Sequence, residues 1–252
     1  MSEIRDVQLN CLEILRHFKK FCDENDLIFY LCGGCCIGSI RHMGFIPWDD
    51  DIDVFMPRDD YIKLSYLWNK KPNNKNYLFS YPSEKFSGRI FSNISLLKKN
   101  NAIACLDIFP LDGCPRNFIS REIQIFWALL YSLFLVQKIP ENHGNFIKFV
   151  CKFLLDIVRN KYARYKIWSF SEKRMSKYKF YKSKYITELC AGPKYIRNKY
   201  PSIIFVGRVY KKFENLEVPL PLGYDRYLRI AFGNYMELPE KSQRIPQHIY
   251  IV

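Results

Sequence analysis

An acidic block precedes an apolar stretch in the first quarter of the chain. Asp49, Asp50, Asp51 and Asp53 fall within five residues, and the apolar residues 54–56 follow directly. Carboxylates this close repel one another unless a partner compensates their charge. Because residues two apart on a strand face the same side, a strand through this block would project Asp49, Asp51 and Asp53 together. That arrangement suits a hard divalent cation such as Mg²⁺ or Mn²⁺, which prefers oxygen ligands.

An acidic loop that caps the following helix is the alternative interpretation of this block. A solvated loop, however, does not require the apolar residues that alternate with the carboxylates around Asp53. That alternation is typical of a strand with one buried face. We therefore favour the cation site.

A glycine pair lies just upstream of the acidic block. Residues 27–31 are rich in aromatic and β-branched side chains and predict a strand that enters Gly33-Gly34. A helix is expected over residues 35–41. Glycine lets the backbone approach a ligand closely, and the free N–H groups at a helix start attract phosphate. The pair therefore predicts a phosphate cradle facing the carboxylates.

The remaining pattern indicates an α/β fold, with a mixed sheet flanked by helices. Apolar residues recur at helical spacing through the first 24 residues, and residues 58–68 predict a second helix. Asp107 is expected near the end of a strand, where it would meet the first carboxylates. Asp112 is expected in a turn before Gly113. Further strands are predicted at residues 77–81, 90–97 and 102–109.

The net charge of +14 is concentrated in the middle of the chain. Residues 138–212 hold 19 Lys and Arg against 4 Asp and Glu, a net of +15, so the remainder (20 basic, 21 acidic) has a net of −1. Such a region can bind nucleic acid, an anionic membrane leaflet or an anionic saccharide. A merely solvated helical face would mix charges of both signs more evenly. We favour the membrane or saccharide and do not expect nucleic acid.

Two apolar runs, residues 125–136 and 146–158, lie in or beside the basic region. Neither reaches the roughly 20 residues needed to cross a bilayer. They predict core helices, and peripheral contact with an anionic membrane is a second hypothesis. We expect a catalytic core at residues 1–115, a basic and aromatic-rich helical insertion at 116–205, and a C-terminal segment at 206–252 that packs on the core.

The nine cysteines are an odd number, which does not suit a disulfide framework. The opening residues lack the apolar run of a secretory signal. We expect a cytoplasmic protein, peripheral at the inner face of the membrane, with free and mostly buried thiols. Cys32-Gly33-Gly34-Cys35 has the spacing of a redox motif, but a redox site would leave the acidic block unexplained.

Several segments resemble the LicD family of nucleotidyltransferase-fold phosphotransferases, which includes phosphocholine transferases and fukutin-related proteins. The similarity is most specific at Gly33-Gly34, Arg41-His42 and residues 44–53 (GFIPWDDDID), followed by residues 56–61 (MPRDDY). Residues 107–113 (DIFPLDG) and scattered positions from Phe213 to Arg244 extend it. Two positions depart from the family pattern: Cys35-Cys36 replaces its usual Thr, and Gln247-His248 replaces its His pair.

The resemblance implies a CDP-linked donor, most often CDP-choline, and a hydroxyl acceptor on a glycan, free or lipid-linked, such as lipopolysaccharide, capsule or teichoic acid. It also implies a third acid from a strand neighbouring the first, which Asp107 would supply. An aromatic cage for choline would draw on Trp48, Tyr30, Tyr81 or Phe109. The expected catalytic residues are Asp49, Asp51, Asp53 and Asp107; the metal ligands are Asp51, Asp53 and Asp107; the donor contacts are Gly33, Gly34, Arg41, His42 and Arg58.

Two other classes of protein remain compatible with these residues. A nucleotidyltransferase acting on a small molecule or RNA would use the same glycine pair and carboxylates. A non-catalytic interaction protein would bind a cation through the acidic block without turning over a donor.

Overall fold

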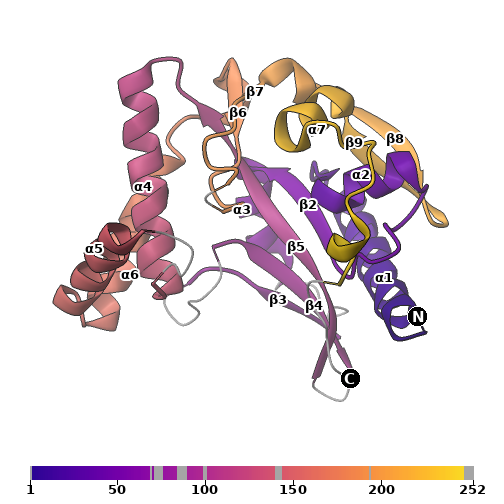
Figure 1. Ribbon diagram of the computed structural model, residues 1–252, viewed down its shortest axis with the longest axis horizontal. Helices are drawn as coiled ribbons and strands as arrows, with labels where there is room; N and C mark the ends of the chain where they lie inside the picture. The colour runs from indigo at the N-terminus through magenta and orange to yellow at the C-terminus, as the bar shows by residue number, and fades with distance from the viewer. Residues whose placement is uncertain are drawn as a thin grey trace.

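The computed structural model describes residues 2–68, 70, 76–83, 90–98, 101–139, 144–192 and 194–246. It is a mixed α/β structure (Figure 1), which confirms the predicted fold class. The helices are α1 (Ser2–Glu24), α2 (Gly33–Arg41), α3 (Arg58–Trp68), α4 (Phe118–Val136), α5 (Asn145–Ile157), α6 (Lys161–Met175) and α7 (Tyr224–Phe232). The strands are β1 (Tyr30–Leu31), β2 (Ile52–Pro57), β3 (Tyr77–Ser80), β4 (Ser92–Lys98), β5 (Asn101–Cys114), β6 (Tyr185–Thr187), β7 (Tyr200–Pro201), β8 (Arg208–Phe213) and β9 (Leu216–Pro221).

The main sheet is built around β5, its longest strand. The order is β1-β2-β5-β4-β3, and β6 joins the far end of β5 and carries β7. β2 and β5 run parallel, whereas the other pairs are antiparallel. The parallel register sets Asp53 beside Asp107 and Phe55 beside Phe109. Since residues two apart share a face, all four side chains lie on one side of the sheet.

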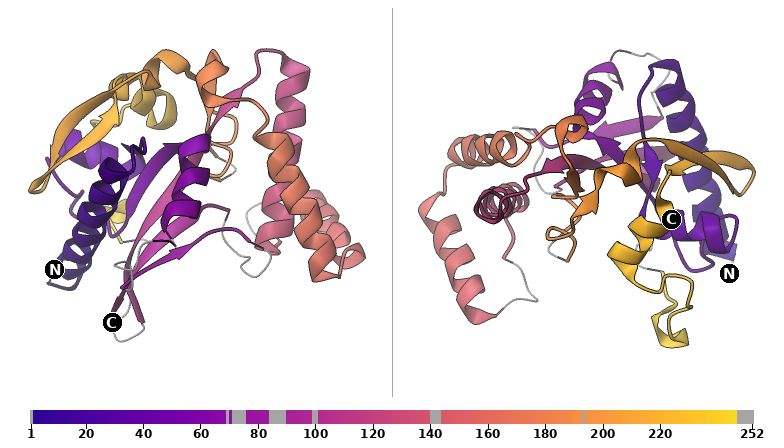
Figure 2. Two further views of the ribbon diagram at one scale, coloured as in Figure 1. Left: turned by 180° about the vertical axis from the view of Figure 1, so that it is seen from behind. Right: turned by 90° about the horizontal axis from the view of Figure 1, so that it is seen from above.

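Helices α1 and α3 cover the opposite side of the sheet, as the view from behind shows (Figure 2, left). The residues of β2 that alternate with Asp53 and Phe55 are fully buried: Ile52, Val54 and Met56. They join the apolar stripe of α1 in the larger hydrophobic core. This packing fixes which face of β2 turns toward the site.

A second, smaller core lies among α4, α5 and α6. In Figures 1 and 2 these helices stand together at one side of the sheet. α4 is long and apolar enough to cross a membrane by length and composition, a test that buried core helices also pass. Its buried Gln124 donates to the carbonyls of Gly113 and Met175, and its buried Arg121 donates to Thr187 Oγ1 and to the Ile196 carbonyl. These bonds hold α4 against the rest of the protein.

The C-terminal segment packs beside the start of the chain. The hairpin of β8 and β9 lies against β1 and α2, and α7 lies near α2 and β9. At the hairpin turn, Glu214 accepts a two-pronged ion pair from Arg5 at 2.8 and 3.0 Å. Gln247 and His248, which the family resemblance singled out, lie outside the described residues.

Several predicted boundaries are confirmed and others are corrected. α3 spans residues 58–68 as expected, whereas the strand predicted at 27–31 shrinks to two residues. The strand predicted at 102–109 extends to Cys114, because β6 continues its pairing beyond β4. Asp107 therefore lies inside a strand and not near its end. Asp112 is a fully buried strand residue, and the predicted turn is wrong.

Candidate active site

A cavity of about 300 Å³ opens where the acidic block, the start of α2, α7 and the segment after β6 meet. Asp49, Asp51 and Asp53 all line it, together with Gly33 and Gly34. Only Asp53 belongs to β2, because the strand begins at Ile52. The side chains of Asp49, Asp51 and Asp53 thus reach one cavity, as expected. The expectation that all three lie on a strand is wrong for Asp49 and Asp51.

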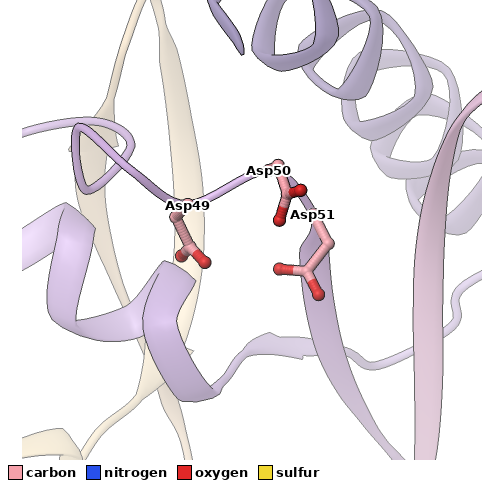
Figure 3. Close-up of side chains that lie close together, drawn as sticks. All are labelled: Asp49, Asp50 and Asp51. Carbon is pink, nitrogen blue, oxygen red and sulfur yellow. The ribbon is translucent and has the colours of Figure 1, made fainter. Parts of the chain in front are cut away.

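Oxygen atoms of Asp49, Asp50 and Asp51 lie within 4.8 Å of one another. Figure 3 shows the three carboxylates turned to the same side of the backbone segment. Asp50, which the sequence analysis left out of the ligand set, belongs to this cluster. A group of hard oxygen donors at this spacing fits Mg²⁺ or Mn²⁺, and Asp49 and Asp51 belong both to the cluster and to the cavity.

The glycine pair is explained by how closely these carboxylates approach the backbone. A Cβ at Gly34 would lie 2.4 Å from Asp49 Oδ2, and one at Gly33 would lie 3.2 Å from Asp53 Oδ2. Gly33 also has φ +55°, a conformation that other residues rarely adopt. The start of α2 therefore meets the carboxylates directly, and the positive end of the helix dipole stabilises negative charge there.

The N–H of Gly33 is engaged within the protein. It donates to the hydroxyl of Tyr227 on α7 at 3.0 Å. This bond removes Gly33 from the predicted set of backbone phosphate donors, whereas Gly34 faces the cavity one residue further into the helix. Gly33 contributes by its shape and conformation, and Tyr227 fixes α7 over the start of α2.

The pKa of Asp53, one of the carboxyl groups that line the cavity, is strongly raised. Burial raises its pKa well above the ordinary range, and the carboxylates of Asp51, Asp107 and Asp49 add to the shift. Asp107 lies beside it on β5, and Asn93 of β4 lies beside Asp107. Four acids in one buried neighbourhood call for a compensating cation, which is the chemical fit expected of a metal site.

An aromatic wall, formed by Tyr195, Tyr227 and Phe232, lines the same cavity as the carboxylates. Tyr195, Tyr227 and Phe232 approach one another with ring centroids 5.8 Å apart for Tyr195–Phe232 and 6.4 Å apart for Tyr227–Phe232. Phe55 and Phe109 extend the wall along β2 and β5. These two follow Asp53 and Asp107 by two residues, so strand periodicity could have identified them; no local pattern marks the other three.

Glu188 also lines the cavity, and no local sequence pattern marks it as a site residue. It follows β6 directly, is almost fully buried, and accepts hydrogen bonds from the Tyr200 hydroxyl and from Asn198 Nδ2. Burial raises its pKa to about 7, and the hydrogen bonds from Tyr200 and Asn198 oppose that shift. A carboxyl group with this pKa can exchange a proton near neutral pH.

Comparison with known proteins agrees with this geometry. Residues 26–143 match a family model described as the nucleotidyltransferase domain of LicD/FKTN/FKRP. The matched segment, slightly less than half of the chain, is similar to a LicD-family domain. It is 29% identical to the lipopolysaccharide cholinephosphotransferase LicD of Haemophilus influenzae over 265 residues, 98% of this chain and 96% of that protein. An uncharacterized protein of Rickettsia prowazekii is 25% identical over 117 residues, 46% of this chain and 39% of that protein.

The matched LicD-family domain holds only part of the cavity. It contains the glycine pair, the acidic block and Asp107, all between residues 26 and 143. Glu188, Tyr195, Tyr227 and Phe232 come from the chain beyond it. The similarity to the Haemophilus LicD protein continues through that part of the chain.

Arg58 has a structural role in place of the donor contact that the LicD resemblance suggested. Its guanidinium is buried and donates to both oxygens of Asp112 at 2.9 and 2.6 Å. A third bond of 3.2 Å reaches Glu172 on α6. These ion pairs join α3, β5 and α6, and Arg58 is not among the residues that line the cavity.

Arg41 and His42 also lie away from the cavity. They stand at the C-terminal end of α2, about 12 Å from Gly33 at a helical rise of 1.5 Å per residue. Arg41 donates to the carbonyls of Tyr235 and Glu237 at 2.8 and 3.0 Å, which ties down the chain after α7. The helix therefore separates these two residues from the phosphate cradle that they were expected to join.

Of the four aromatic residues expected in a choline cage, the structure places Phe109 in the cavity. Trp48 lies under the guanidinium of Arg244, 5.4 Å from the ring centroid. The hydroxyl of Tyr30 donates to the Phe205 carbonyl, and Tyr81 stacks on Phe79. These three side chains are occupied in packing elsewhere.

All nine cysteines are free and eight are buried, as expected. Burial raises the pKa of both Cys32 and Cys35, the opposite of what a reactive thiolate requires. Cys35 Sγ donates to the Asp51 carbonyl at 3.5 Å. The residue that replaces the family's Thr thus holds the acidic block to the start of α2.

Proposed function

We propose that this protein transfers a phospho-alcohol group, phosphocholine in the first instance, from a CDP-linked donor to a hydroxyl of a cell-surface glycan. The observation that carries the proposal is one cavity that is lined both by a group of carboxylates and by an aromatic wall. The first surface suits a metal-bound diphosphate, and the second suits a quaternary ammonium group.

Asp49, Asp51 and Asp53 would hold one or two divalent cations, with Asp107 beside Asp53 supporting a second position. A bound Mg²⁺ or Mn²⁺ supplies charge neutralisation for the donor diphosphate and for its leaving oxygen. Gly34 and the start of α2 present backbone N–H groups on the same side. In this arrangement the donor's phosphates would enter from the cavity, beside the carboxylates that contact the start of α2.

The aromatic wall would bind the alcohol part of the donor. Tyr195, Tyr227 and Phe232 present ring faces and edges within a few ångströms of each other. Ring faces attract a quaternary ammonium through cation–π interaction. Buried Glu188 adds negative charge to the same cavity. CDP-choline fits this combination better than CDP-ribitol or CDP-glycerol, which carry no cation.

The acceptor hydroxyl must lose a proton as it attacks the phosphorus bound to the alcohol. Glu188 has a pKa of about 7, and is therefore a better matched base near neutral pH than an ordinary carboxylate. Asp107, beside Asp53 on the neighbouring strand, is the second candidate. CMP leaves with the former bridging oxygen, and the alcohol phosphate remains on the glycan.

The glycan acceptor follows from the relative with the longest match. The Haemophilus protein is named a lipopolysaccharide cholinephosphotransferase, and the similarity extends along nearly the whole of both chains. We propose a surface glycan of this kind as acceptor, and a cytoplasmic location, where CDP-linked donors are made.

A donor panel tests which phosphorus is attacked. Purified protein with Mg²⁺ is mixed with CDP-choline, CDP-ethanolamine, CDP-ribitol or CDP-glycerol and an acceptor glycan, and phosphorus NMR follows the products. We expect metal-dependent release of CMP, stoichiometric with glycan modification and fastest with CDP-choline. Pyrophosphate release from CTP or ATP without CMP release from the panel would establish a nucleotidyltransferase instead. Metal binding without turnover of any donor would indicate a non-catalytic protein.

A matched pair of variants tests the aromatic wall. Tyr195→Ala is expected to raise KM for CDP-choline by about tenfold, because a cation–π contact is worth about 1 kcal/mol or more. The same change should leave KM for CDP-ribitol nearly unaltered. Tyr81→Ala, outside the cavity, serves as the control and should change neither value.

A further inference from the structure

Helix α5 exposes an apolar face that none of the described residues covers. Phe146, Phe149, Phe153 and Ile157 are 78%, 67%, 55% and 63% exposed. Their spacing of three and four residues places them on one side of the helix. Scattered apolar residues are normal on a protein surface, but four large ones in one stripe mark an interaction site.

The C-terminal half of α5 connects it to its neighbours. Leu155 is buried in the smaller core among α4, α5 and α6. Arg164 of α6 donates to the carbonyls of Leu155 and Val158, which closes the C-terminal end of α5, and to Gln137 Oε1 after α4. These contacts hold the C-terminal end of α5 beside α6 and the end of α4.

Basic side chains border this apolar face. Lys152 lies one helical turn after Phe149 on α5, and Arg159 and Lys161 follow the helix. Lys138 and Lys152 line an open cleft of about 720 Å³ between α5 and the end of α4, together with Asp156 and Arg164. Within the described residues, neither lysine of this cleft has an ion-pair partner, and the cleft can accept an anionic headgroup.

We infer that α5 docks this protein on an anionic membrane, with its phenylalanine face in the interface and Lys138 and Lys152 at the level of the lipid phosphates. A helix of 13 residues is about 20 Å long, too short to cross a bilayer. An apolar stripe flanked by lysines is the pattern of an interfacial helix. The charge favours an anionic leaflet over an apolar protein partner, and the inference does not depend on the reaction proposed above.

Vesicle binding tests this inference with the full chain. Co-sedimentation is measured with vesicles of phosphatidylcholine alone and of phosphatidylcholine mixed with phosphatidylglycerol. We expect the mixed vesicles to bind more strongly, and the difference to shrink as salt is raised. The double variant F149S/F153S should weaken binding to mixed vesicles by about tenfold or more, and K138E/K152E should abolish the preference for anionic lipid.

The control variant is I62S/Y66S, which makes the same kind of change on the exposed face of α3 and should bind as the unmodified protein does. Thermal melts confirm that each variant is folded. Equal binding to both vesicle types would overturn the inference, as would F149S/F153S binding as well as the unmodified protein. A dimer in sedimentation equilibrium that F149S/F153S converts to monomer would assign the face to a second copy of the chain and also overturn it.

Discussion

The cavity and the α4–α6 helices depart from the usual distribution of residues in opposite ways. The cavity places the carboxylate of Glu188 in the interior, with Asp53 partly buried, whereas α5 places Phe146, Phe149 and Phe153 on the surface. Charged groups are ordinarily exposed and large apolar groups ordinarily buried. Each region therefore calls for a binding partner of complementary chemistry: a cation for the carboxylates of the cavity, and an apolar surface for the phenylalanines of α5.

The two regions also differ in how their parts come together. The cavity draws on β2, β5, the start of α2, the segment after β6 and α7, which span about 200 positions of the sequence. The apolar face of α5 comes from a single helix. The apolar face of α5 is therefore formed by residues close together in the sequence. The cavity depends on the sheet order and register that bring distant residues together.

The largest effect is expected from Asp53→Asn. Removing a metal ligand should lower turnover by about a thousandfold or more, because it removes several kcal/mol of transition-state stabilisation. The free energy of unfolding in metal-free buffer should stay constant or rise, since the buried like charges no longer repel. Turnover and urea unfolding are measured on the same preparation.

Asp59→Asn is the control, because Asp59 is an exposed residue paired with Lys179 outside the cavity. It should leave turnover within about twofold of the unmodified protein, as expected for an exposed pair. Near-normal, metal-dependent turnover of Asp53→Asn would show that the cavity is not the metal site.

Arg58→Ala is expected to lower the free energy of unfolding by about 3–5 kcal/mol, since it leaves buried Asp112 without its partner. Urea unfolding provides the measurement. Arg229→Ala, which breaks an exposed pair with Asp225, should cost less than about 1 kcal/mol. If Arg58→Ala instead kept its stability and raised only KM for the donor, Arg58 would be a phosphate ligand and its structural assignment would fail.

Glu188 should make stability fall as pH rises. Its folded-state pKa of about 7 lies above the ordinary 4.5, so the folded protein binds the proton more tightly than the unfolded chain. Its stabilising contribution is complete below pH 4.5 and is lost by about pH 7, a difference of up to about 3 kcal/mol. Glu188→Gln should remove this part of the pH profile of unfolding, measured without metal.

Glu122→Gln, on an exposed pair of α4, is the matched control for that profile and should leave its shape unchanged. The raised pKa of Asp53 also makes the free energy of unfolding fall as pH rises, and both variants keep this contribution because they retain Asp53. A Glu188→Gln profile that overlays the unmodified one would mean that Glu188 stays ionised in the folded protein.

The smallest effect is expected from Cys35→Ser. A serine hydroxyl can still donate to the Asp51 carbonyl, so turnover should be retained and stability should change by less than about 1 kcal/mol. Cys36→Ser, one position along in the apolar core, should cost more, because it buries a hydroxyl among apolar groups. Lost activity of Cys35→Ser, together with a reversible disulfide between Cys32 and Cys35, would support a redox site instead.

Among single elements, sequence and structure agree best where a local pattern decides the outcome. α3 begins at Arg58, at the strand end, and ends at Trp68, as its apolar spacing predicts. The glycine pair was correctly expected to face the carboxylates, and the Cβ distances at Gly33 and Gly34 give the steric reason. Strand periodicity also connects Asp53 to Phe55, since both face the cavity.

The sequence by itself determined the α/β class and the acidic block beside a helix start. These follow from charge and from the periods of helix and strand, which are local quantities. The prediction of a core helix at 146–158 is wrong for α5, in which only Leu155 is buried. Only the tertiary structure decided that Arg58 pairs with Asp112, that Arg41 lies at the far end of α2, and that Glu188 and Tyr195 enter the cavity. Those contacts join positions far apart in the chain, and they are set by the sheet order and the register of β5 with β2 and β6, which no local pattern encodes.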